Sequence, residues 1–214
     1  MEKIDNQSEY WDNVADQKNF THTLDTTFLN RYFNKNDKIL DYGCGYGRIV
    51  NQLINRGFFN IKGYDTSINL IKRGKTINPE CPIQHIKSLK ELNIDNESVK
   101  GIVLFAVLTC IPSNAGQEEL INYLHEILEL NGIIYLSDYY LQPNSKQLDR
   151  YQYLNGDPSN YGVFTLPEGV TFRHHTKDWI HILFKKFKII EEKQVKVLTM
   201  NGHEAECFQI IAQK

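Results

Sequence analysis

The chain has 214 residues, with 24 lysines and arginines against 26 aspartates and glutamates, a formal net charge of -2. This length is typical of one domain, and a content of 41% hydrophobic and 12% aromatic residues suffices for a core, which excludes overall disorder. The balanced charge lacks the basic excess of a nucleic-acid binder or of a protein that binds anionic membranes.

The sequence carries no pattern for a membrane or a metal. Its longest apolar run, residues 101–111, is shorter than the roughly 20 residues that span a bilayer, and the first ten residues contain acids where a signal peptide has an apolar core. The four cysteines form no CxxC pair, and the histidines lack the usual ligand spacing. We therefore expect a soluble cytoplasmic protein with reduced thiols and no metal site.

The first part of the chain favours helices. One segment carries Tyr10 and Trp11, and a second, residues 24–33, is rich in leucine and aromatic residues. We expect residues 1–37 to form an N-terminal helical cap laid against a sheet.

From residue 38 onward, apolar runs alternate with amphipathic stretches, which is typical of a parallel sheet with helices on both faces. Apolar residues at helical spacing fill residues 49–54 and 120–128. Two final strands are predicted at 187–198 and 204–212, joined across the turn dipeptide Asn201-Gly202, so that an antiparallel pair ends the domain. The other predicted strands are residues 38–42, 60–64, 82–87, 102–107 and 132–137.

Residues 141–175 interrupt this alternation and are predicted to be an inserted lid. Their second half indicates a hairpin in which Leu166 pairs with Val170. Because side chains alternate along a strand, this register puts His174 opposite Gly162 on one apolar face with Phe164 and Phe172. Arg173 and His175 are expected to point the other way, into solvent.

The motif that indicates chemistry is the turn DYGCGYG, residues 41–47, between the first strand and the next helix. Glycine lets the backbone turn sharply and lie close to a ligand, and the helix start offers free N–H groups. Asp65 ends the neighbouring strand, where an acid can accept hydrogen bonds from both ribose hydroxyls. A nucleoside ligand is predicted.

Two features argue against a dinucleotide. The glycines are spaced G-x-G-x-G, whereas the dinucleotide fingerprint is G-x-G-x-x-G. Asp41, just before them, would repel a pyrophosphate but suits a positively charged ligand group such as an ammonium or a sulfonium.

With these motifs the sequence resembles the class I S-adenosylmethionine-dependent methyltransferases, whose loop reads acid-x-Gly-x-Gly-x-Gly. Residues 105–108 are similar to the segment that contacts the methionine part, and residues 128–136 are similar to the turn into the fifth strand. The resemblance implies a single domain over residues 1–214, with an α/β, Rossmann-like, seven-stranded, mostly parallel sheet, helices on both faces and the last strand antiparallel. Ser88 departs from the family's adenine-binding acid.

The resemblance also implies a cofactor, S-adenosylmethionine, and a reaction, methyl transfer (EC 2.1.1.-) to an O, N or S atom. Tyr10 and Trp11 are expected to cover the cofactor, and acceptor-handling side chains should follow the carboxyl ends of the strands. The predicted cofactor-binding residues are Tyr10, Trp11, Asp41, Gly43, Cys44, Gly45, Gly47, Asp65, Thr66, Ser88, Leu89, Phe105 and Ala106. The candidates for handling the acceptor are Asp138, Tyr139, Arg150, Tyr151, Tyr161 and His174.

The insertion adds aromatic residues and few basic ones, which favours a small-molecule acceptor over a polynucleotide. We expect a monomer or a homodimer. RNA, peptide or protein methylation stays open as an alternative, and so does a non-catalytic S-adenosylmethionine-binding regulatory subunit, which a blocked acceptor pocket would favour. A dinucleotide oxidoreductase is the weakest alternative. His174 is interpreted either as a base or as a packed core histidine.

Overall fold

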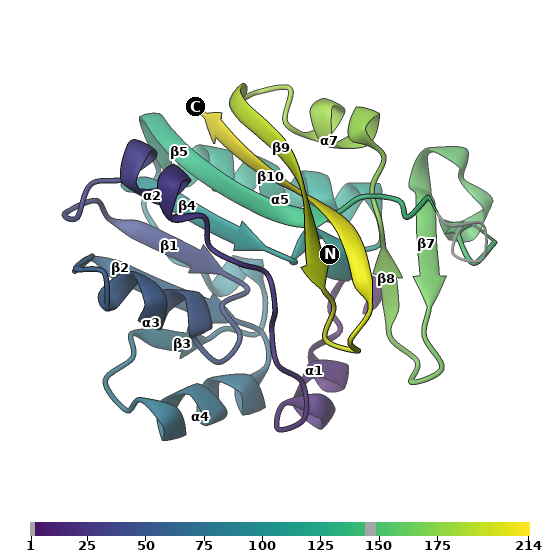
Figure 1. Cartoon of the computed structure of the whole chain (residues 1–214), viewed down its shortest axis with the longest axis horizontal. Helices are drawn as coiled ribbons and strands as arrows, with labels where there is room; N and C mark the ends of the chain where they lie inside the picture. Colours follow the sequence, from purple (N-terminus) through teal and green to yellow (C-terminus); the bar gives the residue numbers. More distant parts are fainter. Residues whose placement is uncertain (1–2, 144–148) are drawn as a thin grey trace.

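The computed structural model describes residues 3–143 and 149–214, and a seven-stranded sheet forms its centre (Figure 1). The strand order is β3-β2-β1-β4-β5-β10-β9. Neighbouring strands are parallel from β3 to β5, and β10 is antiparallel to both β5 and β9. The strands are β1 (Ile39–Tyr42), β2 (Ile61–Asp65), β3 (Ile83–His85), β4 (Val99–Phe105), β5 (Leu128–Tyr139), β9 (Lys188–Leu198) and β10 (Glu204–Gln213).

Helices cover both faces of this sheet, as the alternating sequence pattern predicts. One apolar layer joins α2, α3 and α4 to the sheet, and the other joins α5 and α7 to its opposite face. Four helices start at side chains that cap free backbone N–H groups: Asp25, Ser67, Ser113 and Thr176. The helices are α1 (Ser8–Val14), α2 (Thr26–Tyr32), α3 (Arg48–Ile54), α4 (Ile68–Ile77), α5 (Asn114–Ile127) and α7 (Lys177–Leu183).

These elements confirm the predicted fold class, with three local corrections. Leu128 belongs to β5, because the helical stripe ends at Ile127. Ala106 lies in a turn with a positive φ of 53°, outside the strand that was expected to reach residue 107. Helix α1 buries no residue on the sheet, because Asp12 holds it to the start of α4 and its aromatic residues pack on the insertion.

The insertion after β5 forms a second, three-stranded sheet in the order β6-β7-β8. Phe164 pairs with Phe172, and the N–H of His174 donates to Gly162 O at 3.0 Å, so the predicted hairpin register is confirmed. Residues 144–148 of the predicted insertion, and residues 1–2 of the predicted cap, lie outside the described residues. The strands are β6 (Gln152–Tyr153), β7 (Tyr161–Thr165) and β8 (Thr171–Arg173).

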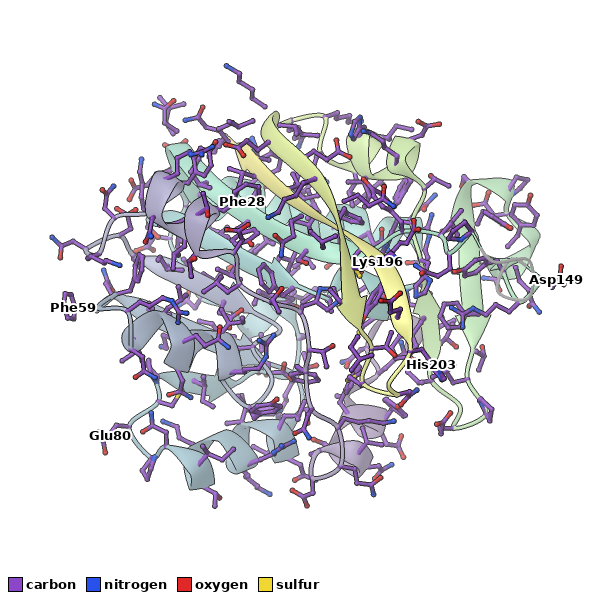
Figure 2. All side chains as sticks on the ribbon, in the orientation of Figure 1. Phe28, Phe59, Glu80, Asp149, Lys196 and His203 are labelled. Atoms are coloured by element: carbon purple, nitrogen blue, oxygen red, sulfur yellow. The ribbon has the colours of Figure 1, made fainter. Side chains whose placement is uncertain are left out.

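Short 3-10 helices complete the connections. Among them η3 (Leu108–Cys110) follows β4 and forms part of the rim above the sheet. The others are η1 (Lys3–Asp5), η2 (Leu89–Glu91), η4 (Leu154–Gly156) and η5 (Pro158–Asn160). In Figure 2 the side chains fill the space between these layers, with Phe28 among them and His203 near the insertion.

Candidate active site

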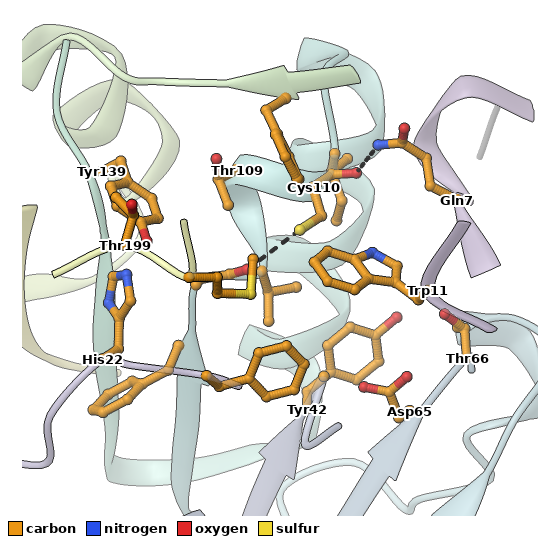
Figure 3. Close-up of a pocket in the computed structure, with 18 of the residues that line it drawn as sticks. Gln7, Trp11, His22, Tyr42, Asp65, Thr66, Thr109, Cys110, Tyr139 and Thr199 are labelled. Carbon is orange, nitrogen blue, oxygen red and sulfur yellow. Dashed lines mark hydrogen bonds between the residues drawn. The ribbon is translucent and has the colours of Figure 1, made fainter. Parts of the chain in front are cut away.

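A cavity of about 440 Å³ lies beyond the carboxyl ends of β1, β2, β4 and β5, where open α/β sheets place their ligands. Figure 3 shows Asp65, Thr66, Tyr42 and Trp11 at one end and His22 and Tyr139 at the other. Predicted site residues that line it are Trp11, Asp41, Gly43, Cys44, Asp65, Thr66, Ser88, Leu89, Phe105, Ala106, Tyr139, Arg150 and His174. Predicted residues outside its lining are Tyr10, Gly45, Gly47, Asp138, Tyr151 and Tyr161.

The glycine turn positions Asp65. The Gly45 N–H donates to one carboxylate oxygen of Asp65 at 2.8 Å, and the Ser67 N–H donates to the other at 2.8 Å. Burial raises the pKa of Asp65, whereas these two N–H groups lower it. A Cβ on Gly45, whose φ is +55°, would lie 2.0 Å from the Phe20 ring, so glycine is required because of an aromatic side chain at this point.

Asp41 is a charged group in the cavity lining with an unsatisfied oxygen. It is buried, and its Oδ2 has no hydrogen-bond partner. Burial raises the pKa of Asp41 to about 8, Arg48 opposes the shift, and Asp65 adds to it. A buried acid without a partner fits a ligand that brings its own positive charge.

A segment between α1 and α2 reaches the cavity although the sequence analysis did not single it out. Phe20 stacks on Tyr46 at 5.1 Å and meets Trp11 edge-on at 5.9 Å. The Nδ1 of His22 lies 2.9 Å from Ser137 Oγ, while its buried Nε2 has no partner. Burial and Arg48 lower the pKa of His22 to about 3, so this imidazole is neutral.

At the acceptor end Tyr139 lies between two histidines. Its ring stacks on His174 at 5.1 Å and meets His22 edge-on at 4.7 Å. The Tyr151 hydroxyl accepts from Gln142 N at 3.1 Å and lies 2.7 Å from His174 Nδ1. The Tyr151 hydroxyl proton finds an acceptor in Nδ1, and in the tautomer that this direction requires, Nε2 carries the N–H.

The hydrogen bond to Tyr151 affects the role of His174, which the sequence analysis interprets either as a base or as a packed core histidine. Burial lowers the pKa of His174 well below its ordinary value, and Arg150 and His175 lower it further. The neutral ring therefore offers an N–H donor from Nε2 and has no free lone pair for a proton. His174 lines the cavity with Phe164 and Phe172 as expected, and the bonding pattern favours a hydrogen-bond donor over a base.

The expectation that Arg173 and His175 are solvated is wrong, because η5, α5 and α7 cover that side of the hairpin. Arg173 is 2% exposed and donates to the carbonyl oxygens of Tyr161, Pro112 and Ser159 and to the amide oxygen of Asn114. Its guanidinium also lies over the Trp179 ring at 5.0 Å.

The second of these residues, His175, is 1% exposed and lies between Tyr139 O and the side chain of Gln117. It also lies 3.9 Å from Asp138, which does not line the cavity. The Asp138 carboxylate accepts from Thr109 N and Tyr139 N, so it braces the loop after β4.

The turn between β9 and β10 closes the cavity from a direction that the sequence analysis did not anticipate. β10 begins at Glu204, ahead of Cys207, which pairs with Tyr139 at the end of β5, so the hairpin projects past the sheet. Its tip is held to the N-terminal segment by Lys18 Nζ, which donates to Asn201 Oδ1 at 2.7 Å. The tip residues that line the cavity are Thr199, Met200, Asn201, His203, Glu204 and Ala205.

Residues 3–143 and 149–214 contain no group of three or more His, Cys, Asp or Glu side chains that could hold a metal ion. In the same residues, none of the helices has the length and apolar character needed to cross a membrane.

Comparisons with known proteins agree with this geometry. A family profile described as a methyltransferase domain matches residues 16–183. A S-adenosylmethionine-dependent methyltransferase from Methanosarcina mazei has a TM-score of 0.78 at 23% identity, over 87% of this chain and 96% of that one. One from Mesorhizobium loti has a TM-score of 0.65 at 16% identity, over 88% and 96%.

A third structure holds ligands. It is the 1,6-didemethyltoxoflavin-N1-methyltransferase of Burkholderia thailandensis with bound 1,6-didemethyltoxoflavin and S-adenosylhomocysteine, and its TM-score is 0.62 at 11% identity, over 88% of this chain and 76% of that one. No curated protein matches the sequence. Because the profile spans most of the sequence and the folds agree, the chain belongs to the methyltransferase-domain family, with the class I fold and S-adenosylmethionine as its cofactor.

Proposed function

We propose that this protein transfers a methyl group from S-adenosylmethionine to an O, N or S atom of a small molecule. The observation that carries the proposal is one continuous cavity, with Asp65 and Asp41 at one end and Tyr139 and His174 at the other. The N-terminal segment, the insertion and the β9–β10 tip all line it, which favours a small acceptor over a polymer. The toxoflavin methyltransferase, which has a similar fold, also binds a small molecule.

The residues present fit the cofactor. S-adenosylmethionine, when bound, would supply a sulfonium methyl group for in-line transfer to the acceptor atom, with S-adenosylhomocysteine as the leaving group. In this proposal Asp65 accepts from the ribose hydroxyls with the lone pairs that Gly45 and Ser67 leave free. The unpartnered Asp41 oxygen accepts from the ammonium of the methionine part, and Ser88 and Leu89 lie on the adenine side.

The remaining side chains orient the acceptor and exclude water, which are the main tasks in such a displacement. Tyr139, stacked on His174, forms one wall, and the Nε2–H of His174 donates to the acceptor. Trp11 and Phe172, whose rings are 6.2 Å apart, close the opposite side. If side chains filled the acceptor end of the cavity, a non-catalytic regulatory subunit would be favoured. The acceptor end is open, which favours an enzyme.

S-Adenosylhomocysteine is expected to raise the Tm by about 5 to 10 °C at roughly 100 times its Kd, because it binds only the native state. NAD and NADP should leave the Tm unchanged. Differential scanning fluorimetry measures all three, and an equal shift with NAD would contradict the cofactor assignment. Methyl transfer itself is tested with isotopically labelled S-adenosylmethionine and a metabolite extract, followed by mass spectrometry of the labelled product.

Asp65→Ala is expected to weaken S-adenosylhomocysteine binding roughly 10- to 100-fold, the usual effect of losing charge-assisted hydrogen bonds. Isothermal titration calorimetry provides the Kd. Asp95→Ala removes an exposed carboxylate far from the cavity lining and serves as the control, with no change expected. If Asp65→Ala binds as tightly as the wild type, the ribose contact lies elsewhere.

A further inference from the structure

Two polar side chains of the insertion, Arg150 and His174, both pack against the ring of Phe164. The Arg150 guanidinium carbon lies 3.9 Å from the centroid of Phe164, and the His174 ring lies 4.8 Å from the same centroid. Arg150, Phe164 and His174 all line the acceptor end of the cavity. The lining at this end of the cavity therefore includes a cation and an imidazole that both pack against Phe164.

The charge of Arg150 has no counterpart in the described residues. None of their carboxylates forms an ion pair with it, and its buried Nε has no hydrogen-bond partner. Arg173, in the same insertion, contrasts with it because its guanidinium donates to a set of surrounding oxygens. Arg150 is thus a cation placed against aromatic rings and open to a ligand.

Other charged groups of the cavity do not neutralise it. Asp5 is bound to Ser113, and Glu204 lies 3.3 Å from Lys196. Asp41 and Asp65 belong to the cofactor end, and so does Glu119: burial raises the pKa of Tyr42, and the charges of Asp65 and Glu119 add to that shift. The acceptor end therefore presents a positive charge within walls formed by Trp11, Tyr139, Phe164, Leu166 and Phe172.

We infer that the acceptor is an apolar molecule carrying a carboxylate, which Arg150 binds together with the Nε2–H of His174. The inference rests on the proposed function and names its substrate class. A planar guanidinium matches a carboxylate through two parallel hydrogen bonds, and the imidazole N–H adds a third donor. A neutral analogue would desolvate Arg150 without giving it a partner, so the site rejects it.

The first test uses labelled S-adenosylmethionine and a metabolite extract in three forms. One portion is untreated, one has its carboxylates capped as methylamides with methylamine and a water-soluble carbodiimide, and one is treated with alkaline phosphatase. We expect labelling of a small molecule in the untreated and phosphatase-treated portions and loss of that labelling after capping. Labelling that survives capping, or that is lost to phosphatase, would overturn the inference.

These outcomes separate this inference from the proposed function. If the untreated extract yields no labelled small molecule, methyl transfer to a small molecule fails. If it yields one that is neutral or cationic before methylation, methyl transfer stands and only the carboxylate is rejected.

The second test varies Arg150 with the partially purified acceptor. Arg150→Gln is expected to raise the acceptor KM roughly 10- to 100-fold, as for a lost charged hydrogen bond, with the Kd of S-adenosylhomocysteine unchanged. Arg150→Lys should restore part of the loss. The control is Arg56→Gln, an exposed arginine at the end of α3, for which no change is expected. An unchanged KM in Arg150→Gln, or an equal loss of S-adenosylhomocysteine affinity, would overturn the role of Arg150.

Discussion

Asp41→Asn is expected to weaken S-adenosylhomocysteine binding by about 30- to 1000-fold while making the ligand-free protein more stable. Removing one partner of a buried ion pair costs about 3 to 5 kcal/mol. At pH 7 the wild type must first ionise Asp41, whose pKa is about 8, before it can pair with the ligand. This ionisation reduces the contribution of the ion pair to binding by about 1.4 kcal/mol. The remaining 2 to 4 kcal/mol, roughly, is the expected loss in the variant.

The pH dependence follows from the same carboxyl. In the ligand-free folded protein its pKa is about 8, whereas in the unfolded chain it is about 4. Between these values the folded state binds more protons, so this group lowers the free energy of unfolding as the pH rises from about 4 to about 8. A cationic ligand favours the carboxylate, so the affinity of the wild type should rise with pH and level off near pH 8.

Calorimetry at pH 6, 7 and 8 measures the affinity, and thermal melts over the same range measure the stability. Asp41→Asn should flatten the affinity profile and raise the Tm, with the largest rise at pH 8, where the wild type has lost the most stability by ionising this buried group. Asp95→Asn, which removes an exposed carboxylate, is the control. If the affinity of the wild type for S-adenosylhomocysteine does not change with pH, Asp41 does not contact the ammonium group of the ligand.

Gly162→Ala is expected to lower methyl transfer at least about 100-fold and to leave S-adenosylhomocysteine affinity within error. A Cβ at this position would lie 2.1 Å from the carbonyl oxygen of His174, and the φ of +98° disfavours any side chain. Strands β7 and β8 would have to separate, which displaces His174 from the acceptor. A displacement of about 1 Å near reacting groups can lower a rate about 100-fold.

The same hairpin offers a matched control in Gly169→Ala. Gly169 has a φ of +90°, but a Cβ there would meet no atom within 4 Å. Gly169→Ala should lower the free energy of unfolding through backbone strain alone, by roughly 1 to 3 kcal/mol. We therefore expect its Tm to fall while it still labels the acceptor in the extract. If Gly162→Ala turns over normally, the position of His174 does not matter for the reaction.

Sequence reasoning succeeded where a short stretch of chain decides the outcome. The glycine turn and Asp65 were predicted because the spacing of residues along one strand, turn and helix determines their geometry. The pairing of Gly162 with His174 was predicted because a three-residue turn and the two-residue period fix a hairpin register.

It failed where distant parts of the chain meet. Arg173 occupies the outward position of its strand, and only the placement of η5 and α5 over that face buries it. Phe20 and His22 carry no motif, and they reach the cavity because their segment crosses the glycine turn. The Asn201-Gly202 turn was expected, but its place above the cavity depends on how far β9 and β10 run past β5.

The contact between Lys18 and Asn201 joins residues that are 183 positions apart in the chain. At the cofactor end, by contrast, the glycine turn, Asp65, Ser88 and Ala106 follow β1, β2, β3 and β4, all within residues 41–110, and Trp11 is added from the N-terminal segment. Contacts between distant residues form late in folding, because the chain entropy of closing a long loop is lost before they stabilise anything. The contact between Lys18 and Asn201 should therefore form late in folding, and the acceptor end of the cavity is complete only once the β9–β10 tip has reached the N-terminal segment.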